Sequence, residues 1–169
     1  MQKKVINIFV VIFAIIVVSI VSIQVFSKRE AIKVIDVAIG EKIAAEKIEG
    51  TALPTSIQYT NAIVDAIEYQ IISVNEENNT ALVSFTYVDA IGLADKYGES
   101  VENIDGFYTY CVDTISCGEA PFITKEIEVQ YDVDESRKEN KCLIRNSPDL
   151  ADALTGGTYS AYIQLLGGE

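Results

Sequence analysis

The sequence predicts an α+β protein, in which an N-terminal transmembrane helix precedes an antiparallel sheet covered by helices. Three observations lead to this prediction. An uncharged apolar run fills residues 5–26, apolar and polar residues alternate near residues 80–88 and 122–132, and helical spacing marks the segments around them. We expect three parts: a membrane anchor at residues 1–27, an amphipathic helix at 28–54 leading into the domain, and an α+β domain at 55–169.

The apolar run lies between two basic pairs, Lys3-Lys4 and Lys28-Arg29. As a helix it would rise about 33 Å, which matches a hydrocarbon core of about 30 Å. The side chains that mark this anchor are Val5, Phe9, Phe13, Ile16, Ile20 and Phe26. A run of this kind predicts that the membrane is one partner of the chain.

A cleaved secretory signal is the alternative, with a cut after Ser27 and Val25 at the −3 position. The run is longer than a usual signal and no A-x-A-like site follows it, which favours a retained anchor. Basic residues on both sides do not set the orientation. A short N-terminus before a large C-terminal domain is typical of a signal anchor. We therefore expect a single-pass cell-membrane protein with an extracytoplasmic domain, or a secreted domain if the segment is cleaved.

Charge excludes one class of partner. Two of the 13 basic residues precede the apolar run and all 25 acidic residues follow it. From Glu49 to Thr124 the sequence contains one basic residue, Lys96, and twelve acidic residues. Such a surface repels phosphate backbones, so nucleic acid is not expected as a partner. The acidic surface attracts cations or a basic partner, or simply keeps the domain soluble.

The chain has no histidine, which removes Ser-His-Asp and Cys-His catalysis and the commonest metal ligand. Its three cysteines, Cys111, Cys117 and Cys142, match neither a C-x-x-C redox pair nor a four-ligand zinc site. We expect neither a metal nor a cofactor. In an oxidising compartment two of the cysteines could form a disulfide; the alternative is buried thiols. A helix over residues 111–117 would separate Cys111 and Cys117 by about 9 Å, too far for that pair.

Two helices are expected ahead of the sheet. Ile32, Ile35, Ile39 and Ile43 recur at near-helical spacing after Ser27, and this stripe should pack on the sheet. Gly50 ends the run. A second helix is expected from about Thr55 to Ala66, with Ile57, Ile63 and Ile67 inward.

Two hairpins are expected to build the sheet. Glu68–Val74 and Thr80–Val88 are β-prone runs joined by an Asn- and Glu-rich turn. In the second run Ala81, Val83, Phe85 and Tyr87 share one face. Phe122–Asp132 alternates most clearly, and residues 141–145 return after a charged turn.

Residues 89–116 give a mixed signal. Apolar residues recur at steps of four and three, which indicates a helix from about Ile91 to Ile104. Gly92, Gly98 and Gly106 weaken it, and residues 107–115 are rich in strand formers. Beyond Gly106 helix and strand both stay open.

The last helix is clearly delimited. Ser147 is its expected N-cap, Pro148 its first residue, and Gly156-Gly157 its end. Leu150, Ala153 and Leu154 form its buried side. The apolar tail at 159–166 should dock on the domain.

The stretch from Ile144 to Gly157, IRNSPDLADALTGG, resembles the ending of exported or lipid-anchored bacterial domains with a nuclear transport factor 2-like fold. The runs Tyr69–Val74 and Ala81–Val88 resemble that family's central hairpin. The resemblance implies a curved antiparallel sheet wrapping helices into a cone, and no particular reaction. The family often carries a tryptophan where this chain has Cys142, and a lipidated cysteine where this chain has its apolar run.

These features predict a non-catalytic, membrane-tethered domain that binds a protein or a small molecule. A pilin-like subunit, or a subunit of another membrane assembly, is the first alternative. It rests on an apolar helix that leads into an amphipathic one. A cavity enzyme using an Asp/Tyr pair is the second, with an acidic base and a phenolic donor. Its candidate residues are Asp89, Asp95, Tyr87 and Tyr97.

Overall fold

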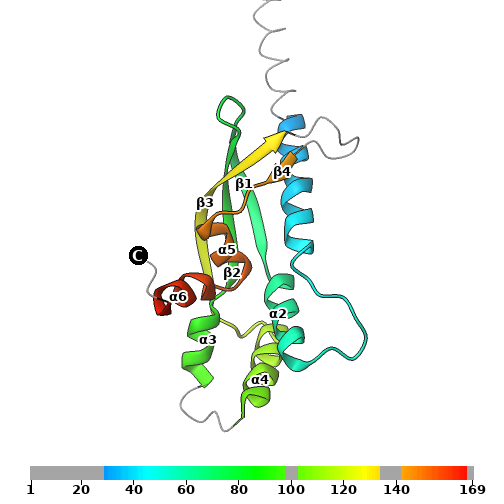
Figure 1. Ribbon diagram of the computed structural model, residues 1–169, viewed down its shortest axis with the longest axis vertical. Helices are drawn as coiled ribbons and strands as arrows, with labels where there is room; N and C mark the ends of the chain where they lie inside the picture. Colours follow the sequence, from blue (N-terminus) through cyan, green and yellow to red (C-terminus); the bar gives the residue numbers. More distant parts are fainter. Residues whose placement is uncertain (1–28, 98–102, 134–141, 167–169) are drawn as a thin grey trace, which may run out of the picture.

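The computed structural model describes residues 29–97, 103–133 and 142–166. In this part of the chain a four-stranded antiparallel sheet, ordered β1-β2-β3-β4, combines with helices (Figure 1). The α+β class and the antiparallel sheet are therefore confirmed. The predicted anchor lies outside the described residues. Among the residues that are described, no helix combines the length and apolar character needed to span a bilayer.

The sheet is built on its two central strands. β2 (Thr80–Val88) pairs along its whole length with β3 (Phe122–Val133), and β1 (Glu68–Asn75) pairs on the other side of β2. The short β4 (Cys142–Ile144) completes the opposite edge. A register shift leaves Ile72 unmatched and half-exposed on edge strand β1. A bulge of this kind discourages another strand from pairing with that edge.

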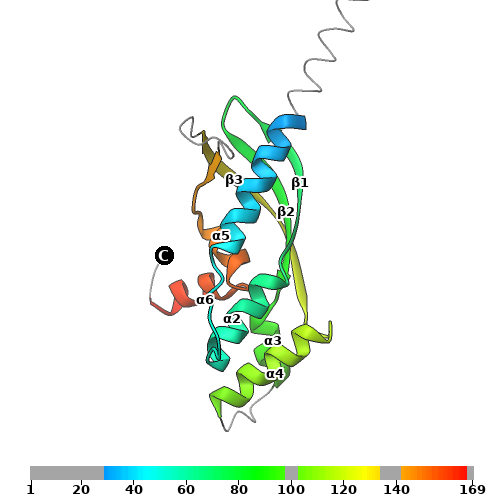
Figure 2. The same ribbon diagram turned by 90° about the vertical axis from the view of Figure 1, so that its right-hand side faces the viewer.

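Residues 29–44 form a helix that we call the leading helix. It lies along one face of the sheet, parallel to its long direction (Figure 2). Ile35 and Ile39 are buried against Val83 and Phe85, as the predicted stripe requires. Tyr69 donates a hydrogen bond from its hydroxyl to the Asp36 carbonyl at 3.0 Å, which fixes the helix to β1. The predicted helix over 28–54 is too long, because the described helix ends at residue 44 and coil follows.

Helix α5 (Pro148–Leu154) covers the same face as the leading helix, and its predicted caps are confirmed. Ser147 Oγ accepts a hydrogen bond from Leu150 N at 3.2 Å. Gly156 follows α5 with φ +66°, and its carbonyl accepts a hydrogen bond from Ala90 N at 3.0 Å. We call the leading helix, the four strands and α5 the sheet core.

Beyond the lower end of the sheet in Figure 1 lie α2 (Thr55–Asp65), α3 (Ala90–Tyr97) and α4 (Ile104–Ser116), here called the helical end. The prediction of one helix from 91 to 104 is wrong at its far end. Asn103 is extended and its side chain accepts a hydrogen bond from Asp105 N at 2.8 Å, so it caps a new helix. The open choice for residues 107–116 is settled as helix.

The tail does not dock as expected. Helix α6 (Thr158–Leu165) has no buried residue, and Leu165 is 86% exposed. Asp152 Oδ1 accepts a hydrogen bond from Ser160 N at 2.9 Å, so a polar contact with α5 holds the start of α6. The apolar composition of the tail predicted docking, but no residue of α6 is buried against the domain.

Candidate interaction surfaces

The four candidate residues of the predicted Asp/Tyr pair lie at the end of β2 and on α3. Tyr87 is 2% exposed and points into the sheet core. Burial, followed by the nearby Asp152, raises the pKa of Tyr87. Asp89 Oδ1 accepts a hydrogen bond from Gly92 N at 2.8 Å, so its carboxylate caps α3. These two residues therefore have structural roles.

The other two candidates both belong to α3. Asp95 is exposed on α3, and Tyr97 packs its ring against Phe107 and Tyr110. The pockets beside α2, β1, α5 and the leading helix are all lined by side chains other than these four candidates. Asp152 and Asp89 lie near enough to the Tyr87 phenol to raise its pKa, but Tyr87 lines none of these four pockets.

The helix-covered face of the sheet is filled with side chains. Phe85, at 0% exposure, lies at its centre with Ile35, Val83 and Leu150 packed around it. A closely packed apolar interior of this kind leaves no room for a ligand in the middle of the sheet.

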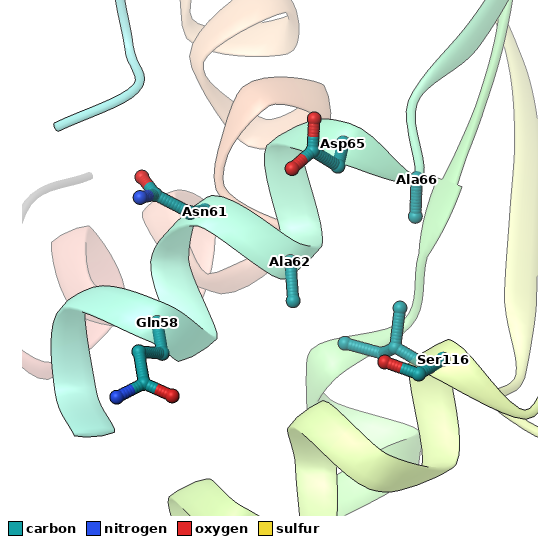
Figure 3. A pocket seen from close by; sticks show the side chains of 7 residues that line it. Gln58, Asn61, Ala62, Asp65, Ala66 and Ser116 are labelled. Atoms are coloured by element: carbon teal, nitrogen blue, oxygen red, sulfur yellow. The ribbon is translucent and has the colours of Figure 1, made fainter. Parts of the chain in front are cut away.

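One surface is the groove between α2 and α4, with a volume of about 480 Å³ (Figure 3). Seven residues line it: Gln58, Asn61, Ala62, Asp65, Ala66, Ile115 and Ser116. Figure 3 shows the polar side chains of Gln58, Asn61 and Asp65 spaced along one side of α2. They come from positions that recur every three or four residues, which places them along one stripe of the helix.

The polar groups of this groove hold the coil that precedes α2. Asn61 binds Ile48 twice, accepting from its N–H at 3.0 Å and donating to its carbonyl at 2.9 Å. Gln58 donates to the Leu53 carbonyl at 2.7 Å, and Asp65 pairs with Lys47. These hydrogen bonds and the ion pair hold residues 47–53 against α2. Most polar side chains that line the groove therefore stabilise this coil.

A second surface is the aromatic cluster of the helical end, formed by Tyr59, Tyr97, Phe107, Tyr108 and Tyr110. Neighbouring ring centroids lie between 4.8 Å and 6.0 Å apart, within the range of favourable ring contacts. Every ring in it is partly exposed. Burial, then the nearby Cys111 and Tyr108, raises the pKa of Tyr59 to about 12, so its hydroxyl stays protonated at neutral pH. Half-exposed tyrosines combine apolar contact area with hydrogen bonding, as binding surfaces require.

The third surface is the outer face of the sheet, which no helix of the described chain covers. It is polar, with Gln70, Ser84 and Glu126 side by side across three strands. Thr86 and Thr124 hydroxyls share a hydrogen bond of 2.9 Å next to them. Glu128 lies further along the same face and is exposed. An antiparallel sheet commonly leaves such a face to water.

The cysteines form no disulfide within the described residues, which contain all three. Cys111 is buried in the helical end, Cys142 is buried in the sheet core, and Cys117 is exposed at the end of α4. Burial raises the pKa of the Cys111 thiol to about 11 and also raises that of Cys142. Because residues 111–116 are helical, the Cys111–Cys117 pairing fails on distance. The described residues hold no group of three metal-ligating side chains.

The sequence did not reveal the groove or the aromatic cluster. Tyr97 and Tyr108 were visible as part of a helical pattern, but Tyr59 joins them from α2, 38 and 49 residues earlier in the chain. Comparisons with family models, with curated proteins and with solved structures find no match to this chain.

Proposed function

We propose that this chain is a membrane-tethered, extracytoplasmic, non-catalytic binding domain that presents its helical end to a partner. The observation that carries the proposal is the filled sheet core, which leaves surface recognition as the chemistry available. The apolar run from Val5 to Phe26 supports the tether. The partner class it favours is a protein, since the aromatic cluster is a surface and not an enclosed pocket.

The arrangement of the elements supports this orientation. The leading helix begins, at residue 29, near the end of the sheet that carries the β1–β2 turn, and the helical end lies at the opposite extreme (Figures 1 and 2). A tether entering at residue 29 would therefore hold the sheet core near the bilayer. The helical end would then point away from it, where a partner can reach the aromatic cluster.

We also retain the nuclear transport factor 2-like cone as part of the proposal. Its support is the sheet that bends around the leading helix in Figure 2, together with the confirmed capped α5. The packed sheet core distinguishes this chain from cones that hold a ligand inside.

A pilin-like subunit is the second candidate, and one observation favours it. The amphipathic leading helix packs lengthwise on a four-stranded antiparallel sheet, directly after the predicted membrane segment. Assembly into filaments, or a processed and methylated N-terminus found by mass spectrometry, would replace the tethered-domain proposal with this one.

Site-specific photo-crosslinking of the full chain in its own membranes tests the proposal. A photoreactive residue replaces Tyr108 in the aromatic cluster, and the matched control replaces Glu128 on the outer face of the sheet. We expect a discrete adduct from position 108 and none from position 128. Adducts from position 128 alone, or from neither position, would contradict recognition by the helical end.

A further inference from the structure

A pocket of about 350 Å³ lies at the other end of the molecule, beside the start of the leading helix. It has three walls: Ala31, Val34 and Ile35 from the leading helix, Tyr131 and Val133 from β3, and Cys142 from β4. The size is at the lower end of the range for small-molecule pockets. The volume suits one narrow apolar group rather than a bulky ligand.

The lining of this pocket is apolar inside and polar at one side. Tyr131 and Cys142 are each 5% exposed, while Val133 is 54% exposed and leaves the pocket partly open. Burial, then Cys142 and Glu76, raises the pKa of Tyr131, so that its ring is an uncharged wall at neutral pH. Glu76 and Asn79 from the β1–β2 turn complete the lining. An occupant would bury apolar surface inside and keep a polar group at the turn.

The position of the pocket identifies the source of that occupant. Ala31 is five residues after Phe26, the last residue of the apolar run. Five residues span at most about 18 Å as extended chain and about 8 Å as helix. A tethered domain thus holds the pocket at the surface of its own bilayer. The densest supply of narrow apolar groups there is the acyl chains of the lipids.

The charges beside the pocket are negative. Glu76, which lines the pocket, and Glu77 are exposed in the β1–β2 turn. Arg29 and Lys33 are exposed on the leading helix, but they share the stripe of Val37, on the side of the helix away from Ala31 and Val34. Carboxylates at the rim attract an ammonium group and repel an anionic head group. This pattern complements a zwitterionic head group, which carries an ammonium, better than an anionic one.

We propose that this pocket takes up one acyl chain of a zwitterionic phospholipid from the leaflet that anchors the chain. The proposal rests on the tether proposed above. Its effect would be to fix the height and tilt of the sheet core on the bilayer, so that the helical end projects outward. It assigns a lipid-binding role to residues that otherwise serve only the packing of the sheet core.

The test uses the full chain reconstituted in phosphatidylcholine vesicles that contain a lipid with a photoreactive diazirine near the end of one acyl chain. After irradiation, digestion and mass spectrometry locate the adducts. We expect adducts on the peptides that contain Val34 and Val133, in addition to those within residues 5–26. The adducts within residues 5–26 report the tether alone.

Two variants target the pocket by different means. Ala31→Phe fills it, and Val133→Asp places a charge on its exposed wall. Each should lower the pocket adducts about tenfold and leave those within residues 5–26 unchanged. Val37→Phe adds the same ring to the opposite, exposed side of the leading helix and should change neither set. Thermal unfolding of each variant establishes that it is folded.

The outcomes separate the two proposals. Adducts within residues 5–26 but none at the pocket would overturn lipid uptake and leave the tether intact. Pocket adducts that persist in both folded variants would show simple contact with the bilayer and would also overturn it. The absence of adducts anywhere would contradict the tether itself.

Discussion

Among the described residues, the sheet core buries fourteen side chains in one cluster, whereas the helices of the helical end bury five and complete their packing with half-exposed rings. The sheet core gains its order from continuous strand pairing, in which nine residues of β2 face nine of β3. The helical end is held by aromatic contacts between α2, α3 and α4. Regions with few buried contacts open more easily than the core around them. Rigidity is therefore concentrated near the proposed tether, and adaptable surface lies far from it.

The largest expected effect comes from the centre of the sheet core. Phe85→Ala removes a ring with no exposed surface and leaves a cavity between the leading helix and the sheet. We expect the free energy of unfolding to fall by about 3–5 kcal/mol, the usual cost of such a truncation. Urea unfolding measures it. A loss below about 1 kcal/mol would mean that the sheet core is not closely packed.

The junction between the two regions should give the next largest effect. Gly156 has φ +66°, and a Cβ there would lie 3.0 Å from the Val88 carbonyl oxygen and 3.1 Å from the Ala90 Cβ. Gly156→Ala should lower the free energy of unfolding by about 2–4 kcal/mol, because the left-handed backbone and the tight contacts both act against the new side chain.

Gly157→Ala is its matched control, because φ is +81° but nothing lies within 4 Å of the new Cβ. It should cost only about 1–2 kcal/mol, the backbone part alone. Equal losses in the two variants, measured by urea unfolding, would show that Gly156 does not hold the regions together.

The aromatic cluster should be less sensitive. Phe107 contacts the rings of Tyr59, Tyr97 and Tyr108, and it is only half-buried. We expect Phe107→Ala to cost about 2 kcal/mol, because part of the apolar area is already in water. Hydrogen exchange should show faster exchange in α3 and α4 with β2 unchanged. Faster exchange in β2 as well would mean that the two regions unfold as one.

The smallest effect is expected at the edge of the sheet, where Arg145 binds Asp132 across β3 and β4. This hydrogen bond and the charge of Arg145 lower the pKa of the Asp132 carboxyl. The pair therefore stabilises the fold above the usual aspartate pKa of 3.8, and this contribution is lost as the pH falls through the lower folded value. Asp132→Asn should lower the urea midpoint slightly at pH 7 and not at pH 2. The same difference at both pH values would exclude the ion pair as its cause.

Local patterns in the sequence predicted the sheet core well. The alternation at Ala81, Val83, Phe85 and Tyr87 is set by the two faces of a strand, and Ser147 with Pro148 signals a helix start by its own chemistry. The stripe at Ile35 and Ile39 was also correctly assigned to the sheet. Each of these signals lies within one element, so no knowledge of the fold was needed to interpret it.

The helical end was predicted less well, because its features join distant parts of the chain. Asn103 interrupts an apolar pattern that otherwise continues from α3 to α4, so one helix was expected where two exist. The aromatic cluster needs Tyr59 from α2, and the groove needs the coil at 47–53. Asp89 looked like a catalytic candidate because a helix cap and a general base use the same carboxylate.

Labelling of Cys117 reports both the side of the membrane on which the domain lies and its folded arrangement. Intact cells that express the full chain are treated with a membrane-impermeant maleimide, with Cys117→Ser as the control. We predict one label per cell-bound chain, lost in the control. Cys111 and Cys142 should be labelled only after unfolding, because they are buried. Labelling that requires permeabilised cells, or a labelled domain released into the medium, would contradict the membrane-tethered, extracytoplasmic domain.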